Sequence, residues 1–284
     1  MQTSKAGAKR VPRQFSETCK RKELDIAVAL PPRLVQRNMA FLQRHGLGVE
    51  VMLYDTNWVC NWPKEKVADL GKSLRDLDVK VSAHGPVHDL NPGSLDVVIR
   101  EYTQHCFFKT LSVCQAVGAK YLVLHLGINP LLPDSALDKW LTDSLLTWRP
   151  IVGLAEQLGI TILLENMFLP SPKFLVALKE GLASERVKFC FDIGHFQVYT
   201  GIPLEEWLDR LGRDIVELHL NDNSGADDEH LALGAGMIDF SAAFSQLASR
   251  NILPRFVLEM TSKKFVRSLS YLTANDLLSP FRRR

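Results

Sequence analysis

The sequence predicts an α/β protein that folds as a single (β/α)₈ TIM barrel, and three observations support this fold class. From residue 24 onward, short β-branched runs alternate with longer amphipathic stretches, which is the pattern of a parallel sheet. The alternation contains eight strand-like runs and eight helical stretches. The chain has 284 residues, and such barrels commonly need about 250. An open, doubly wound sheet is the alternative fold.

Each predicted strand is a short apolar run, and a segment with helical periodicity follows it. The expected strands span residues 24–30, 49–53, 79–84, 121–125, 160–165, 187–192, 215–220 and 255–260. The expected helices span residues 32–45, 65–77, 94–117, 134–158, 172–182, 203–212, 239–250 and 262–279. Ser94 and Asp239 are expected N-caps, because their short polar side chains can accept a hydrogen bond from the first helical turn.

The composition indicates a globular, water-soluble protein. Hydrophobic residues make up 46% of the chain, which is enough for a sizeable core. No apolar run approaches the roughly 20 residues needed to cross a bilayer, and no apolar stretch of a secretory signal follows the basic residues near the N-terminus. We therefore expect a cytoplasmic protein without a membrane partner. The five cysteines are scattered and lack zinc-finger spacing.

Charge is distributed unevenly along the chain. The formal net charge is +2, but residues 1–22 contain seven Lys or Arg and one acid, and residues 282–284 are all Arg. The rest of the chain has 24 basic and 31 acidic residues. We expect residues 1–22 to form a basic, disordered arm and residues 23–284 to form the catalytic barrel domain. A negative body argues against nucleic acid as the partner.

Side chains of the types that bind metals stand at the ends of six consecutive predicted strands. Ionisable groups in strands buried on both faces are costly unless they are paired or bound to metal. Barrel enzymes place their active sites at the carboxyl ends of the strands. The six residues are His84, His125, Glu165, Asp192, His219 and Glu259. Three further candidates follow in adjoining loops: His195, Asp228 and His230.

The nine candidates favour a metal centre over ordinary structural roles. A single histidine at a strand end is more often a hydrogen-bonded structural residue, but nine such side chains at one rim reverse that preference. The imidazoles among them favour zinc, manganese or iron over magnesium or calcium, and we expect zinc or manganese, with up to three divalent ions. The pattern does not separate zinc from manganese.

Six segments together resemble the xylose isomerase-like TIM-barrel superfamily, also called AP endonuclease family 2. This superfamily includes endonuclease IV and many sugar and sugar-phosphate isomerases and epimerases. The segments run from residue 79 to residue 260 and read HGPVHDLNPGS, LVLHLG, ILLEN, FDIGHFQVYTG, LHLNDNSGADDEHLALGAG and VLEM. Their combination is specific for the superfamily but much less specific for one activity.

The resemblance implies two ligand arrangements. Endonuclease IV-like members hold three zinc ions, which would make Glu165 a bridging ligand beside Asp192, His219 and Glu259. The other two metals would then be held by His84 with His125, and by His195 with Asp228 and His230. Isomerases of the superfamily typically need only Glu165, Asp192, His219 and Glu259, with a nearby histidine such as His195 contacting the substrate.

The main functional prediction is metal-dependent hydrolysis of a phosphodiester or phosphate ester of a small metabolite. Hydrolysis would use all nine candidate metal ligands, and Glu165 would orient and deprotonate the attacking water. The alternative is a sugar or sugar-phosphate isomerase or epimerase with a single metal, in which Glu165 and Glu259 exchange a proton beside the carbonyl. His195 completes the predicted catalytic residues, with Glu165 and Glu259. A non-catalytic binding protein is a third class, and the sequence leaves the oligomeric state open.

An abasic-site DNA endonuclease is the less favoured member of the hydrolase group. The first predicted strand, LDIAVALPPR, lacks the Gly-rich, His-containing opening expected of the DNA enzymes, and the loop from His219 to Asp228 is short. Gly85, Pro86 and Val87 stand where an aromatic wedge for entering the duplex is expected. These departures favour a small phosphorylated or sugar-like substrate.

Overall fold

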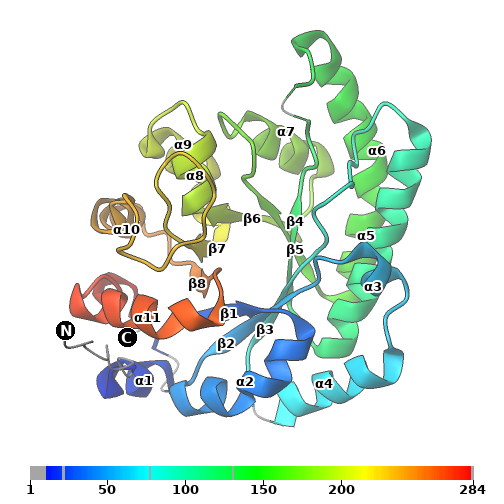
Figure 1. Ribbon diagram of the computed structural model, residues 1–284. Helices are drawn as coiled ribbons and strands as arrows, with labels where there is room; N and C mark the ends of the chain where they lie inside the picture. The colour runs from blue at the N-terminus through cyan, green and yellow to red at the C-terminus, as the bar shows by residue number, and fades with distance from the viewer. Residues whose placement is uncertain (1–10, 21–22, 77, 130, 283–284) are drawn as a thin grey trace, which may run out of the picture.

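Over the residues that the structure describes, eight parallel strands close into a barrel in sequence order, with β8 hydrogen-bonded to β1 (Figure 1). This computed structural model describes residues 11–20, 23–76, 78–129 and 131–282. The closed order confirms the predicted barrel and excludes an open sheet. The strands are β1 (Ile26–Leu30), β2 (Gly48–Met52), β3 (Val81–His84), β4 (Tyr121–His125), β5 (Thr161–Glu165), β6 (Val187–Asp192), β7 (Ile215–Leu220) and β8 (Arg255–Leu258).

Helices surround the strands, as expected for a chain in which each strand is followed by a helical return (Figure 1). They are α1 (Arg13–Lys20), α2 (Pro32–His45), α3 (Thr56–Cys60), α4 (Lys64–Asp76), α5 (Val97–Val117), α6 (Asp134–Leu158), α7 (Lys173–Leu182), α8 (Ile193–Tyr199), α9 (Leu204–Leu211), α10 (Phe240–Ser249) and α11 (Phe265–Ala274). The two longest helices, α5 and α6, end at Gly118 and Gly159, where φ is 81° and 65°. Glycine adopts this left-handed conformation without a Cβ clash.

The main apolar core lies between the strands and the surrounding helices. Large side chains there are almost fully buried, and Phe107 of α5 lies with its ring centroid 5.3 Å from that of Trp148 of α6. A separate, smaller apolar cluster consists of Ala27, Ala29, Met52 and Val257 on β1, β2 and β8. The two alanines give β1 small side chains where other strands carry ionisable ones.

The structure corrects the predicted N-terminal disordered arm over Arg13–Lys20. These residues form α1, and Phe15 and Cys19 are buried in the main core. The apolar side chains lie on one side of the helix and can be buried there. The free energy gained by this burial outweighs the tendency of the neighbouring basic residues to stay in water. The remaining parts of the predicted arm at residues 1–10 and 21–22 lie outside the described residues.

A second correction concerns the start of α5. The expected N-cap, Ser94, lies before the helix, and the Asp96 side chain instead accepts a hydrogen bond from the Val98 N–H. The Ser94 hydroxyl accepts from the Asp96 N–H and so supports the turn that precedes the cap. The other expected N-cap, Asp239, is confirmed, because its side chain accepts from the Ala242 N–H.

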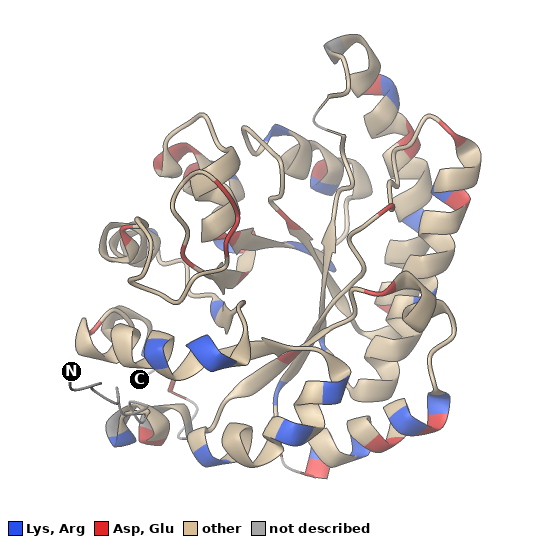
Figure 2. Cartoon of the chain, viewed as in Figure 1, with Lys and Arg blue, Asp and Glu red and all other residues tan. Residues whose placement is uncertain are grey.

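The outer helices and the barrel mouth differ in the sign of their prominent charged residues. Basic residues are prominent on the outer helices, for example α2, α4 and α11, whereas acidic residues colour the loop between β7 and α10 (Figure 2). Within the described part of the chain, no helix is both long and apolar enough to cross a bilayer.

Candidate metal centre

The register of the parallel strands brings the strand-end side chains to one level. His125 at the end of β4 stands opposite Glu165 on β5, and Asp192 at the end of β6 stands opposite His219 on β7. Side chains at the same level of a closed barrel converge on its axis. The nine predicted residues are therefore brought together at the carboxyl ends of the strands, in three adjoining sets.

Glu165 is the centre of this cluster, because its two carboxylate oxygens face different histidines. Its Oε2 lies 2.8 Å from His125 Nε2 and 3.1 Å from His84 Nε2. Its Oε1 lies 3.1 Å from His219 Nδ1 and 3.4 Å from His195 Nδ1. All five side chains are buried. The Glu165 carboxylate thus connects the histidines near β4 with those near β7.

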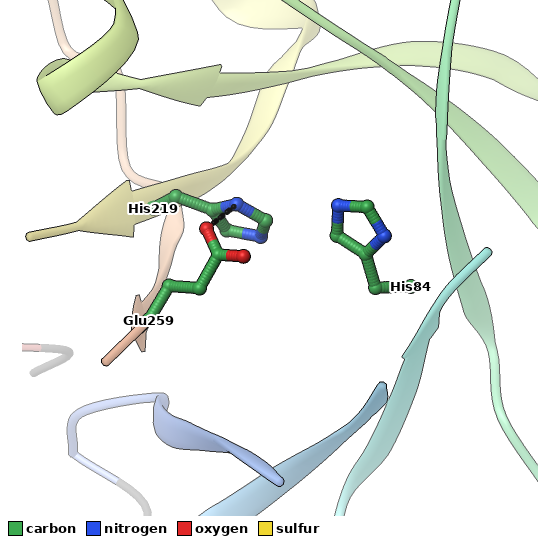
Figure 3. Close-up of side chains that lie close together, drawn as sticks. All are labelled: His84, His219 and Glu259. Carbon is green, nitrogen blue, oxygen red and sulfur yellow. Dashed lines mark ion pairs between the residues drawn. The ribbon is translucent and has the colours of Figure 1, made fainter. Parts of the chain in front are cut away.

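The second set surrounds His219. Its Nδ1 lies 3.0 Å from Glu259 Oε2 and 3.8 Å from Asp192 Oδ2, in addition to its contact with Glu165. Figure 3 shows Glu259 reaching toward His219, with the His84 ring facing them across the site. Donor atoms of Glu165, Asp192, His219 and Glu259 all lie within 4.8 Å of one another, a span that one metal ion can bridge.

The third set lies nearer to solvent and is centred on Asp228. Its Oδ2 lies 3.2 Å from His195 Nε2 and 3.1 Å from His230 Nε2. The His230 Nδ1 is 2.7 Å from the backbone carbonyl of Glu259, so this nitrogen donates to that oxygen. In the neutral ring, Nε2 then keeps the lone pair that a metal ion requires.

The turn after β6 orients two of these residues at once. Asp192 caps α8, because its Oδ1 accepts from the His195 N–H at 2.6 Å, while its Oδ2 accepts from Asn221 Nδ2 at 2.9 Å. The Asn166 side chain accepts from the Asp192 N–H and donates to the Asp192 carbonyl. A cap in the first turn therefore fixes His195 relative to the carboxylate that precedes it.

Sequence reasoning missed several side chains that contact the cluster, among them Glu50 and Tyr54. Glu50 is fully buried, with Oε1 3.2 Å from His219 Nε2, and its Oε2 accepts from the Ser82 hydroxyl. The Tyr54 hydroxyl donates to Glu259 Oε1 at 3.0 Å. The available signal was a glutamate in the middle of the otherwise apolar segment GVEVM. An acid there indicates an interior role once the strand is known to line a barrel.

Mutual contact shifts the pKa values of these buried groups. Burial opposes ionisation of Glu165, but His125 and His219 outweigh it and hold its pKa well below the ordinary value. Burial lowers the pKa of His84, yet the contacts with Glu165 prevail and raise it to about 9. Asp228 raises the pKa of His230 to about 9 against the same burial effect. The cluster therefore has the opposite charges that stabilise it without a bound cation.

The donor set fits divalent metal ions, since it consists of imidazole nitrogens and carboxylate oxygens that converge rather than pair one to one. Among the described residues, buried atoms without an aligned hydrogen bond include His195 Nδ1 and Glu259 Oε2. Each nevertheless lies 3.4 Å or less from an oppositely charged partner. These atoms lie close to their partners but lack hydrogen-bond geometry. This is the arrangement expected of ligand atoms that point at a common metal position rather than at each other.

The family comparison agrees with the barrel. A family model described as "Xylose isomerase-like TIM barrel" matches residues 39–277. An uncharacterised protein of Methanocaldococcus jannaschii, MJ1311, is 34% identical over 185 residues, which are 61% of this chain and 62% of that protein. The chain thus aligns with less than two thirds of that relative's length. A probable endonuclease 4 of Mycoplasma pneumoniae is 28% identical over 205 residues, 64% of this chain and 68% of that protein.

Solved structures extend the similarity over most of the chain. The TTHB071 protein from Thermus thermophilus, described as soaked with ZnCl₂, has a TM-score of 0.77 and 28% identity, covering 92% of this chain and all of that one. A D-tagatose 3-epimerase-like protein has a TM-score of 0.76 and 24% identity, covering 91% and 98%. At that identity the second likeness is one of fold.

Proposed function

The chain belongs to the xylose isomerase-like TIM-barrel family, and on that premise we propose that it is a divalent-metal-dependent enzyme for a small phosphorylated or sugar-like substrate. One observation carries the proposal: nine buried or half-buried metal-type side chains form one cluster with Glu165 at its centre. Three adjoining ligand sets suit up to three ions, with zinc or manganese favoured by the imidazoles.

The number of candidate ligands favours hydrolysis of a phosphate ester, because this reaction would use all three sets. Bound divalent ions would supply Lewis acidity that withdraws charge from a phosphate group. Glu165, whose pKa is held low, is ionised and would orient the water whose oxygen attacks phosphorus and which gives up a proton as it does so. The ester P–O bond breaks, and the leaving alcohol takes up that proton. His195 lies 3.4 Å from Glu165, a Glu259 oxygen lies within 4.8 Å of a Glu165 oxygen, and both side chains would orient the reacting group.

A second candidate reaction is isomerisation or epimerisation of a keto-sugar. The fold comparisons favour it, since several similar solved structures are described as sugar epimerases or epimerase-like proteins. The specific supporting observation is that Glu165 and Glu259 approach the same His219 nitrogen from two strands. Two carboxylates so placed could remove and return a proton on opposite faces of one carbon. This reaction leaves His84, His125, Asp228 and His230 without a required role.

Metal content and activity together test the proposal. We expect the protein purified with added zinc or manganese to bind close to three ions per chain if it is a hydrolase, and close to one if it is an epimerase. Phosphodiesters, phosphomonoesters and keto-sugars are assayed side by side, with Glu165→Gln expected to abolish the activity found. A protein that binds no metal, and whose behaviour Glu165→Gln leaves unchanged, contradicts both candidates.

A further inference from the structure

A hollow at the barrel mouth opens directly beside the candidate metal centre. It has a volume of about 340 Å³, and Glu259 and His230 form part of its wall. Its remaining wall comes from the ends of β1, β2 and β8 and from the start of α2. A space of this size, continuous with the reacting groups, is large enough for a ring-sized part of a substrate.

The walls of this hollow are mainly apolar. Leu30 and Met52 are buried, Leu34 is half-buried, and Met260 closes the side toward β8. The ionisable groups of the wall lie where the hollow meets the cluster, at Glu259, His230 and the hydroxyl of Tyr54, and Thr261 and Ser262 add two further polar residues after β8. A ligand that enters here therefore meets ionisable groups at one end and hydrocarbon at the other.

The space exists because β1 brings small residues to the barrel interior. Ala27 and Ala29 belong to the interior cluster with Met52 and Val257, and Ala29 lines the hollow. None of the nine candidate metal ligands lies on β1 or β2. The two strands thus leave one side of the mouth free of metal-type side chains apart from Glu50, which lies deeper against His219.

We infer that this hollow is a subsite for an apolar, ring-sized group attached to the phosphate that binds at the metal centre. The inference rests on the proposed phosphate-ester hydrolase and narrows its substrate class. It favours organic phosphates with an aromatic or aliphatic ester group over bare sugar phosphates, whose hydroxyl groups would lose hydrogen bonds to water against these walls.

Two phosphonates with the same head group separate the subsite from the metal centre. The zinc-loaded full chain is titrated with phenylphosphonate and with methylphosphonate by calorimetry. We expect phenylphosphonate to bind about ten- to a hundredfold more tightly, the gain from burying a ring of this size. Leu34→Gln should reduce that ratio several-fold and leave the Kd of methylphosphonate unchanged. Leu253→Gln is the matched control, at an exposed leucine before the amino end of β8.

A second measurement needs no variant. With methionine methyl groups labelled with ¹³C, phenylphosphonate should shift the NMR signals of Met52 and Met260 through its ring current, and methylphosphonate should not. Equal affinity for the two phosphonates, or a phenyl preference without shifts at these methionines, contradicts the subsite while leaving the proposed hydrolase standing. Failure of both phosphonates to bind contradicts the hydrolase proposal, and with it the subsite.

Discussion

At the residue scale, His219 is contacted on both nitrogens of its ring. Its Nδ1 faces Glu165 and Glu259, and its Nε2 lies 3.2 Å from Glu50 Oε1. A carboxylate beside Nε2 favours the tautomer with its proton there, which leaves the Nδ1 lone pair free for a metal ion. Glu50 is therefore placed to orient His219 from the side of the ring opposite to Glu165 and Glu259.

This placement predicts that Glu50→Gln weakens zinc or manganese binding about ten- to a hundredfold, the usual effect of removing such a supporting carboxylate. Chelator competition measures the Kd, and ¹⁵N NMR of the His219 ring reports the tautomer. Glu101→Gln, an exposed change of the same type on α5, should leave both unchanged. An unaltered Kd in Glu50→Gln would show that Glu50 only fills the barrel interior.

The raised histidine pKa values predict that metal binding releases protons. His84 and His230, each with a pKa of about 9, carry a proton at pH 7.5 without metal, but a metal ligand must be neutral. The contacts with carboxylates also raise the pKa values of His195 and His219, so we expect two or more protons per chain to be released and metal affinity to rise with pH up to about 9. Calorimetry in buffers of different ionisation enthalpy measures the release. His88→Ala, at an exposed loop position, is the control, and binding without proton release contradicts the prediction.

The sequence predicted which candidate metal ligands lie close together, but not which other side chains contact and orient them. Strand ends can be recognised from the chain, and a closed parallel barrel brings all of them to one rim, so His84 and Glu259 could be placed together without coordinates. Tyr54 lies in a loop after β2, and its contact with Glu259 depends on how that loop folds back over the mouth. Whether the nine residues bind metal stays a prediction that the experiments above test.

At the element scale, the short helix α8 makes the turn after β6 a rigid part of the site. Gly194 in its first turn packs against the Asn221 amide so closely that any Cβ there would collide with it. Asn221 in turn donates to Asp192. Backbone packing between β7 and α8 thus determines the direction of a candidate ligand.

This contact predicts that Gly194→Ala destabilises the fold by about 1–3 kcal/mol, the typical cost of overpacking. It should also weaken metal binding, because the displaced Asn221 no longer orients Asp192. Denaturant unfolding and metal titration measure the two effects. Gly201→Ala is the matched control, since a Cβ at Gly201 meets nothing within 4 Å. Wild-type metal affinity in Gly194→Ala would mean that Asp192 does not depend on this packing.

The eight strands and the long helices were predictable, because each strand is a short apolar run and each long helix has a sustained periodic pattern. Three strands, β4, β6 and β7, begin and end at the predicted residues. Short helices escaped prediction for the opposite reason. The five-residue α3 and the seven-residue α8 have too few turns to show periodicity, and α8 begins at a cap that also has a side-chain role in the candidate site.

At the scale of the whole molecule, the candidate site and the main core are separate structures. The core consists of apolar side chains between strands and helices, whereas the cluster lies at the barrel mouth and is held by pairs of opposite charge. The amphipathic alternation alone specifies the core. We therefore expect the chain to fold without metal and to gain stability when metal binds.

Metal removal tests this separation. At a metal concentration about a hundred times the Kd, binding to the folded state alone adds about 2.7 kcal/mol, or a melting temperature higher by about 5–10 °C. Thermal unfolding with saturating zinc and with excess chelator should show this difference, and circular dichroism at 25 °C should show the same helix content in both. Glu165→Gln should lose most of the metal-dependent increase because its carboxylate joins the ligand sets. If the chelated protein is unfolded at 25 °C, the charge pairs at the mouth do not suffice, and metal is required for the fold as well as for the proposed reaction.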